Sequence, residues 1–120
     1  MSSVIVVDDD PTNAGLLKML LELDGFTVHS CADIEQALEA TTENISAYVI
    51  DINLARGVSG LDLLTKIREG ETNAKADCVV VMSSGDYRRE EESLELGAST
   101  FLLKPYSPDV LSTTLNNLLA

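Results

Sequence analysis

The segment Val4-Ile5-Val6-Val7-Asp8-Asp9-Asp10 decides the fold, because four β-branched residues lead directly into three carboxylates. The apolar run predicts a short strand that is buried on both faces. Strands of this kind form parallel sheets covered by helices, and ligands bind at the carboxyl ends of such sheets. The three acids therefore follow the strand where a ligand site is expected.

A cluster of carboxylates at a strand end needs a compensating positive charge. Two unit charges about 5 Å apart repel by roughly 3 kcal/mol at an effective dielectric constant near 20. A divalent cation with oxygen ligands is the first candidate for that charge. In the alternative interpretation the acids only begin the next helix. The alternative suits Asp10, an N-cap residue followed by Pro11 at the first helical position, and it stays open for Asp8 and Asp9.

The bulk composition limits the classes of function. A chain of 120 residues predicts one domain over 1–120, and 45% of its residues are hydrophobic. The net charge of −12 argues against nucleic acid or an anionic membrane as a direct partner. Since there is no signal peptide and no apolar run near eighteen residues, we expect a cytoplasmic protein. Cys31 and Cys78 follow no metal or redox spacing and should be reduced thiols.

Strand and helix patterns alternate five times along the chain. Strands are expected at 4–7, 27–31, 47–50, 79–82 and 101–103, and a helical pattern follows each of them. The fourth helix should run over 87–96. Leu16, Leu17, Leu20 and Leu23 predict the buried stripe of the first helix, and Asp33 with Gln36 and Ser107 with Pro108 predict two helix starts.

This alternation predicts a parallel sheet with helices on both faces. The second and fifth strands are the weakest and shortest, which places them at the edges. The expected fold is therefore α/β, flavodoxin-like and doubly wound, with five helices and the strand order 2-1-3-4-5. Its switch point lies between the first and third strands, which both lead into aspartates.

Four strand ends contribute polar groups to one edge of this sheet, namely Asp8 and Asp9, Asp51, Ser83, and Lys104. Carboxylates suit Mg²⁺, which also recruits phosphate oxygens as ligands. A lysine supplies a point charge for a phosphate, and a serine hydroxyl can donate to it. Together these groups predict a phosphoryl-transfer site with an aspartate as nucleophile.

On these residues the sequence resembles a response-regulator receiver domain over essentially the whole chain. The resemblance implies that Asp51 is the phosphoacceptor. It also implies that Asp9 and Asp51 bind Mg²⁺ through their carboxylates, Asn53 through its backbone carbonyl, and Asp8 through a bound water. The matching segments are 6–10, 51–54, Gly60, Met82-Ser83, Gly97-Ala98 and Lys104-Pro105.

The resemblance further implies a switch. Ser83 takes the switch hydroxyl position, Lys104 binds the phosphate, and Phe101 lies at the aromatic switch position, turning inward after phosphorylation. Lys104-Pro105 resembles the family's cis peptide. The phosphodonor is a histidine kinase, a phosphotransfer protein or a small phosphodonor. The face formed by the fourth helix, fifth strand and fifth helix then meets a downstream protein, and a phosphorylation-dependent dimer is possible.

Two segments depart from the family pattern. The span from Asp51 to Gly60 is one residue longer than usual, and Ala55 stands where a proline is common. The span from Ser83 to Lys104 is one residue shorter than usual, so Ser84 is an alternative for the switch hydroxyl.

Two alternative functions remain open. A pseudo-receiver would use the same fold as a binding module without phosphorylation, although the intact acids and lysine argue against it. A small aspartyl-phosphate phosphatase would need an acid two residues after its nucleophile, where this chain has Asn53. We therefore expect a phosphoacceptor that assists its own phosphorylation and dephosphorylation rather than an enzyme.

Overall fold

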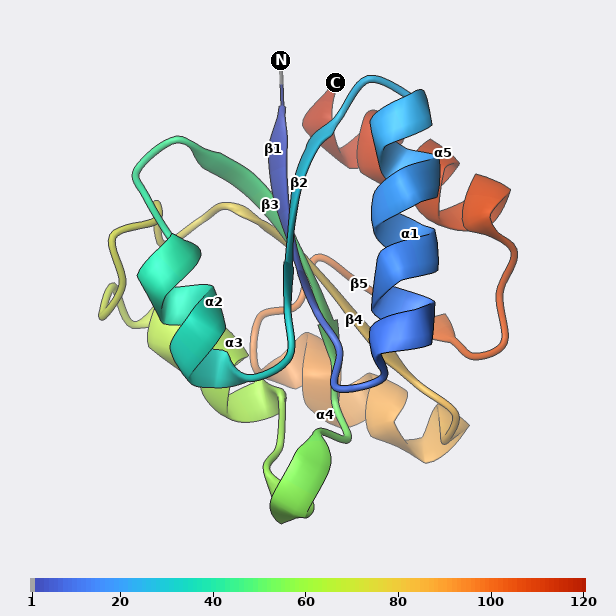
Figure 1. The fold of residues 1–120 in the computed structure, drawn as a ribbon. Coiled ribbons are helices and arrows are strands. Elements are labelled where there is room, and N and C mark those ends of the chain that lie inside the picture. Colours follow the sequence, from blue (N-terminus) through green and yellow to red (C-terminus); the bar gives the residue numbers. More distant parts are fainter. Residues whose placement is uncertain (1) are drawn as a thin grey trace.

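Five parallel strands form one sheet in the order β2-β1-β3-β4-β5, which confirms the predicted doubly wound α/β fold. The structure is a computed structural model and describes residues 2–120. Helices α1 and α5 cover one face of the sheet, and α2, α3 and α4 cover the other (Figure 1). The strands are β1 (Ser3–Val7), β2 (Thr27–Cys31), β3 (Ile45–Asp51), β4 (Val79–Ser84) and β5 (Thr100–Leu103), and the helices are α1 (Pro11–Leu23), α2 (Ile34–Ala40), α3 (Leu61–Arg68), α4 (Glu90–Glu95) and α5 (Pro108–Leu119).

The continuous apolar runs of the central strands reflect two separate cores. Successive side chains of a strand point to opposite faces of the sheet. In β1, Ile5 and Val7 pack into the core that includes α2 and α3 residues, whereas Val4 and Val6 pack into the core that includes α1 and α5 residues. A strand buried on both faces therefore has no polar alternation, as the sequence of β1 predicts.

The strand ends are aligned, so the residues that follow them meet at one edge. Asp51 pairs with Ser83 in the register of β3 and β4. The backbone N–H of Asp8 donates to the carbonyl of Cys31 at the end of β2, at 3.0 Å. The backbone N–H of Lys104 donates to the carbonyl of Ser84 at 2.9 Å. These bonds continue the ladder just past the strands and hold the site residues in fixed positions.

Side-chain caps begin the first two helices where the sequence predicts them. Asp10 Oδ1 accepts from the backbone N–H of Thr12 at 3.0 Å, so Asp10 is the N-cap of α1. Asp33 caps α2 by accepting from Gln36 N, and Gln36 Oε1 accepts from Ala32 N, each at 2.8 Å. The return bond from Gln36 therefore goes to the backbone N–H of Ala32, one residue before the N-cap Asp33. Ser107 occupies the N-cap position of α5 without a side-chain cap bond.

The predicted buried stripe of α1 is wrong in part. Leu17 is buried, but Leu16 and Leu23 are 45% and 77% exposed. The sheet instead receives Ala14 and Leu21, three residues before and four residues after Leu17. Seven of the thirteen α1 positions are Ala, Leu or Met, so more than one apolar stripe fits the helical period. The close approach permitted by the small Ala14 favours the stripe that the structure buries.

The predicted fourth helix is shorter than expected. Residues Tyr87–Arg89 form a 3-10 turn, and α4 spans only Glu90–Glu95. Asp86 starts the turn, because its carboxylate accepts from the backbone N–H of Arg88 at 3.0 Å. Gly97, with φ of +102°, follows the helix at the position where the sequence predicts its end.

The two cysteines are free and buried, as expected. Burial raises the pKa of the thiols of Cys31 and Cys78 above the ordinary value, which keeps both thiols neutral. Within residues 2–120, no helix has the length and apolarity needed to cross a membrane.

Candidate functional site

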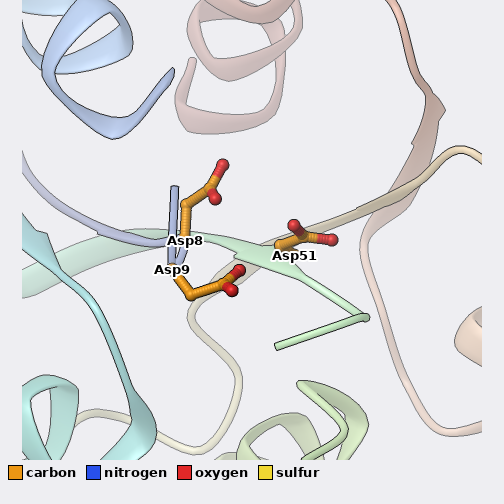
Figure 2. Close-up of side chains that lie close together, drawn as sticks. All are labelled: Asp8, Asp9 and Asp51. Carbon is orange, nitrogen blue, oxygen red and sulfur yellow. The ribbon is translucent and has the colours of Figure 1, made fainter. Parts of the chain in front are cut away.

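Three carboxylates converge at the switch point of the sheet. Asp8 and Asp9 directly follow β1, and Asp51 is the last residue of β3. Figure 2 shows their side chains together, and an oxygen from each lies within 4.8 Å of the others. Asp8 is buried and Asp9 is exposed. Since hard divalent cations such as Mg²⁺ prefer carboxylate oxygens, the donor set fits a magnesium site.

Lys104 brings the opposite charge to the same place. Its Nζ donates to Asp51 Oδ2 at 3.0 Å and lies 3.6 Å from Asp8 Oδ2. Burial alone would lower the pKa of Lys104, but the hydrogen bond to Asp51 and the charges of Asp51 and Asp8 raise it overall. The ammonium is therefore charged at neutral pH. The Lys104-Pro105 peptide bond is cis, as the resemblance implies.

Asp51 is held in an environment that opposes its ionisation. Burial raises the pKa of Asp51, and the charge of Asp8 adds to that effect, while the hydrogen bond and charge of Lys104 oppose it. The net pKa lies above the ordinary value. An ionised Asp51 would therefore gain stability from a further cation at the site.

Asn53 lies beside the phosphoacceptor candidate Asp51. Its backbone N–H donates to Asp51 Oδ1 at 3.2 Å, and its side-chain Nδ2 donates to Ser84 Oγ at 3.4 Å. Ser84 Oγ also accepts from the backbone N–H of Asp86 at 3.1 Å. The Ser84 hydroxyl thus joins the loops that follow β3 and β4.

The loop after Asp51, which the sequence predicts to be one residue longer than usual, contains a tight turn. Residues Ala55–Gly57 form a 3-10 turn in which Arg56 and Gly57 have left-handed φ values of 61° and 71°. The N–H of Leu54 donates to the carbonyl of Val58 at 3.0 Å and closes the turn. The turn at residues 55–57 is exposed, and it lies four residues beyond Asp51.

Ser83 is buried beside Asp51 at the end of β4. Its hydroxyl hydrogen-bonds Tyr106, a residue that the sequence patterns did not identify. Burial raises the pKa of Tyr106, although the charge of Lys104 and the bond to Ser83 oppose that effect. The alternative Ser84 faces the neighbouring loops, so Ser83 remains the better candidate for the switch hydroxyl.

Phe101 is buried in the core that includes α2 and α3 residues and is only 8% exposed. The resemblance implies an inward turn of this ring after phosphorylation. In this structure the ring is already inside, so such a turn would bury little further surface.

Asn13 is a second contact residue that the sequence patterns did not identify. Its Nδ2 donates to Asp8 Oδ2 at 2.6 Å, while the N–H of Asp10 donates to Asp8 Oδ1 at 2.9 Å. Asn13 lies in the first turn of the helix that Asp10 caps. That turn returns the chain over the end of β1.

A half-open cavity of about 400 Å³ lies over these groups. Its lining combines acidic side chains and Lys104 with larger apolar groups that include Leu16 and Tyr106. The cavity brings together a nucleophilic carboxylate, a cation and a set of metal ligands, which is the chemistry needed for phosphoryl transfer.

Comparison with known proteins places this geometry in a family. Residues 4–116 match the model of the response regulator receiver domain. The chain is 28% identical to the transcriptional regulatory protein SrrA of Staphylococcus aureus, over 89% of this chain and 43% of that protein. It therefore spans less than half the length of this curated relative.

Solved structures agree with the match. A response regulator receiver domain protein from Clostridium thermocellum has a TM-score of 0.87 and 27% identity, over 99% of this chain and 94% of that one. The response regulator TrrA from Thermotoga maritima, solved in complex with Mg²⁺ and BeF, has a TM-score of 0.83 and 25% identity, over 98% and 99% of the two chains. On the family match and the shared fold, this chain belongs to the response regulator receiver domains of two-component signalling.

Proposed function

We propose that this domain accepts a phosphoryl group on Asp51, with Mg²⁺, from a phosphohistidine of a histidine kinase or phosphotransfer protein. The observation that carries the proposal is the contact of Lys104 with Asp51 beside the carboxylates of Asp8 and Asp9. A receiver domain solved with Mg²⁺ and BeF supports the choice of metal.

The chemistry needs no separate base. A carboxylate oxygen of Asp51 forms the new bond to phosphorus as the P–N bond of the phosphohistidine breaks, and the imidazole nitrogen keeps the electron pair. Lys104 offers its ammonium to the phosphate oxygens. Mg²⁺ held by Asp8, Asp9, Asp51 and the backbone carbonyl of Asn53 would supply further positive charge. Water then attacks the phosphorus, the P–O bond to Asp51 breaks, and the Asp51 carboxylate is restored as inorganic phosphate leaves.

The output is a shift between two states of the domain. The phosphate favours the state in which the Ser83 hydroxyl donates to it, and this change repositions Phe101 and the face formed by α4, β5 and α5. A downstream protein then binds that face, or two phosphorylated copies pair through it. The position of Ser83 next to Asp51 in the sheet register supports this path.

Acetyl phosphate with Mg²⁺ tests the proposal directly. We expect intact mass spectrometry to show the addition of one phosphoryl group to the wild-type protein and none to Asp51→Asn. Asp77→Asn, which removes an exposed acid outside the site, is the matched control and should behave like wild type. Absence of the mass gain, or its persistence in Asp51→Asn, would contradict the proposal and favour a binding module that works without phosphorylation.

The domain should not act as a general phosphatase. Asn53 is two residues after Asp51 and its amide cannot protonate a leaving group. We therefore expect no turnover of a generic phosphate ester, which a colorimetric assay with p-nitrophenyl phosphate would measure.

A further inference from the structure

Asn13 contacts the most buried carboxylate of the site. Its Nδ2 donates to Asp8 Oδ2 at 2.6 Å, closer than any other contact described for Asp8. Asp10 fixes the start of this helix, because its Oδ1 accepts from the backbone N–H of Thr12 and, at 3.4 Å, of Asn13. The side chain of Asn13 is thus presented to the end of β1 by a capped helical turn.

Each carboxylate oxygen of Asp8 accepts a hydrogen bond. Oδ1 accepts from the N–H of Asp10 at 2.9 Å, and Oδ2 accepts from Asn13. Two donors that approach different oxygens fix the rotation of the carboxylate. Because Asp8 is 4% exposed, bulk water cannot readily replace either donor.

Asn13 also shares Asp8 Oδ2 with Lys104. The ammonium lies 3.6 Å from this oxygen and 3.0 Å from Asp51 Oδ2, so Lys104 is bonded to Asp51 and only near Asp8. The neutral amide of Asn13 donates a hydrogen bond to Asp8 Oδ2 without adding a positive charge. If the amide were absent, Asp8 would be free to turn toward Lys104 and form the closer ion pair.

We propose that Asn13 is a positioning residue, which holds Asp8 ready for the metal and leaves Lys104 paired with Asp51. This inference rests on the proposed function, because it assigns the roles of metal and lysine at the same site. Loss of the amide lets Asp8 turn away from the metal position and draws Lys104 away from the phosphoacceptor. Both effects weaken the site although every residue of the metal site is still present.

Asn13→Leu removes the donor and keeps the number and branching of the side-chain heavy atoms. By isothermal titration calorimetry without any phosphodonor, we expect Mg²⁺ to bind three to ten times more weakly than to the wild type. We expect the rate of phosphorylation by acetyl phosphate at saturating Mg²⁺ to fall as well. Asn117→Leu changes an exposed asparagine of α5 and should alter neither quantity. Asn13→Gln keeps a donor and should recover part of the Mg²⁺ affinity.

A double-mutant cycle separates positioning from a general effect on folding. In an Asp8→Asn background, where the ionic acceptor is gone, Asn13→Leu should cause no further loss of Mg²⁺ affinity. The inference is overturned if Asn13→Leu binds Mg²⁺ like the wild type, or if its effect is as large in the Asp8→Asn background. Should Asn13→Leu not fold, Asn13→Ala, which also lacks a side-chain donor, gives the same comparison. A wild type that binds Mg²⁺ but takes no phosphoryl group would overturn the proposed function instead.

Discussion

Lys104 links the two chemical roles of the site at the scale of single residues. Its ammonium bonds Asp51 at 3.0 Å and compensates the carboxylates that a metal ion would also compensate. Lysine and metal therefore compete for the same negative charge before phosphorylation. Once a phosphoryl group adds negative charge on Asp51, both cations can be accommodated. The lysine should thus oppose metal binding while assisting transfer.

Lys104→Met tests this opposition. Removing the ammonium relieves charge repulsion, so we expect Mg²⁺ to bind about three to ten times more tightly, a change of roughly 0.7–1.4 kcal/mol. The rate of phosphorylation by acetyl phosphate should nevertheless fall at least about tenfold, because a cation is lost from the transferring group. Calorimetry and a mass-spectrometric time course measure the two effects. Lys75→Met, at an exposed lysine, should change neither, and weaker Mg²⁺ binding to Lys104→Met would contradict the idea.

The raised pKa of Asp51 makes a prediction about stability. The folded protein holds a proton on Asp51 more tightly than the unfolded chain does, so ionised Asp51 lowers stability at neutral pH. This loss of stability disappears as the pH falls through the pKa that Asp51 has in the folded protein. Without Mg²⁺, Asp51→Asn should therefore be more stable than wild type at pH 7, with a smaller difference at lower pH. Urea unfolding at several pH values measures it, and a less stable Asp51→Asn would show that the Lys104 bond outweighs burial.

The acids and the lysine were predictable because their charges follow recognisable strands. Asn13 and Tyr106 were not, because each is a single uncharged residue within a helix or a loop. Their importance depends on which way the side chain points after the chain has turned back over the sheet. Period and composition carry no information on that direction for one polar residue.

At the scale of elements, the loop after β3 requires glycine at position 60. A Cβ on Gly60 would lie 2.2 Å from the backbone carbonyl oxygen of Asp51 and 2.6 Å from Ile50 Cγ2. The N–H of Gly60 also donates to the carbonyl of Ile52 at 2.8 Å, which ties the loop to the end of β3. The loop can therefore lengthen at its tip, but not at its base.

Gly60→Ala should disturb both the fold and the site. The nearest atom belongs to backbone, so the chain must move, and we expect a loss of about 2–3 kcal/mol in the free energy of unfolding. Because the moved carbonyl belongs to Asp51, phosphorylation should slow as well. Gly15→Ala in α1 is the matched control, since a Cβ at that position would meet no atom within 4 Å outside the backbone of its own helix. It should gain about 0.5–1 kcal/mol. Equal effects of the two changes on urea unfolding would refute the steric explanation.

The element boundaries show where sequence reasoning reaches its limit. The order and type of the five strands follow from runs of β-branched residues such as Val4–Val7, because apolar strands of this length belong in the middle of a parallel sheet. The rotation of α1 does not follow, since its apolar residues surround the helix and packing selects among them. The 3-10 turn at Tyr87–Arg89 arises from a local bond of Asp86 that competes with the helical pattern.

At the scale of the whole molecule, the net charge of −12 makes two kinds of cation effect possible. Any salt screens the exposed acids over a Debye length of about 8–10 Å. Mg²⁺ bound at the carboxylate cluster adds stability as well, because it binds the folded state but not the unfolded one. The two effects can be separated, since screening depends on ionic strength and binding depends on the site.

Thermal unfolding in MgCl₂ and in NaCl at matched ionic strength should distinguish them. A Mg²⁺ concentration one hundred times the dissociation constant would stabilise the folded protein by about 2.7 kcal/mol beyond screening. Asp9→Asn removes a ligand from the cluster and should lose most of this specific increment while responding normally to NaCl. Glu91→Gln, which removes an exposed acid of α4, should keep the increment. If MgCl₂ and NaCl stabilise the wild type equally, the prediction is wrong. The carboxylates of the cluster then repel one another without binding a divalent cation specifically.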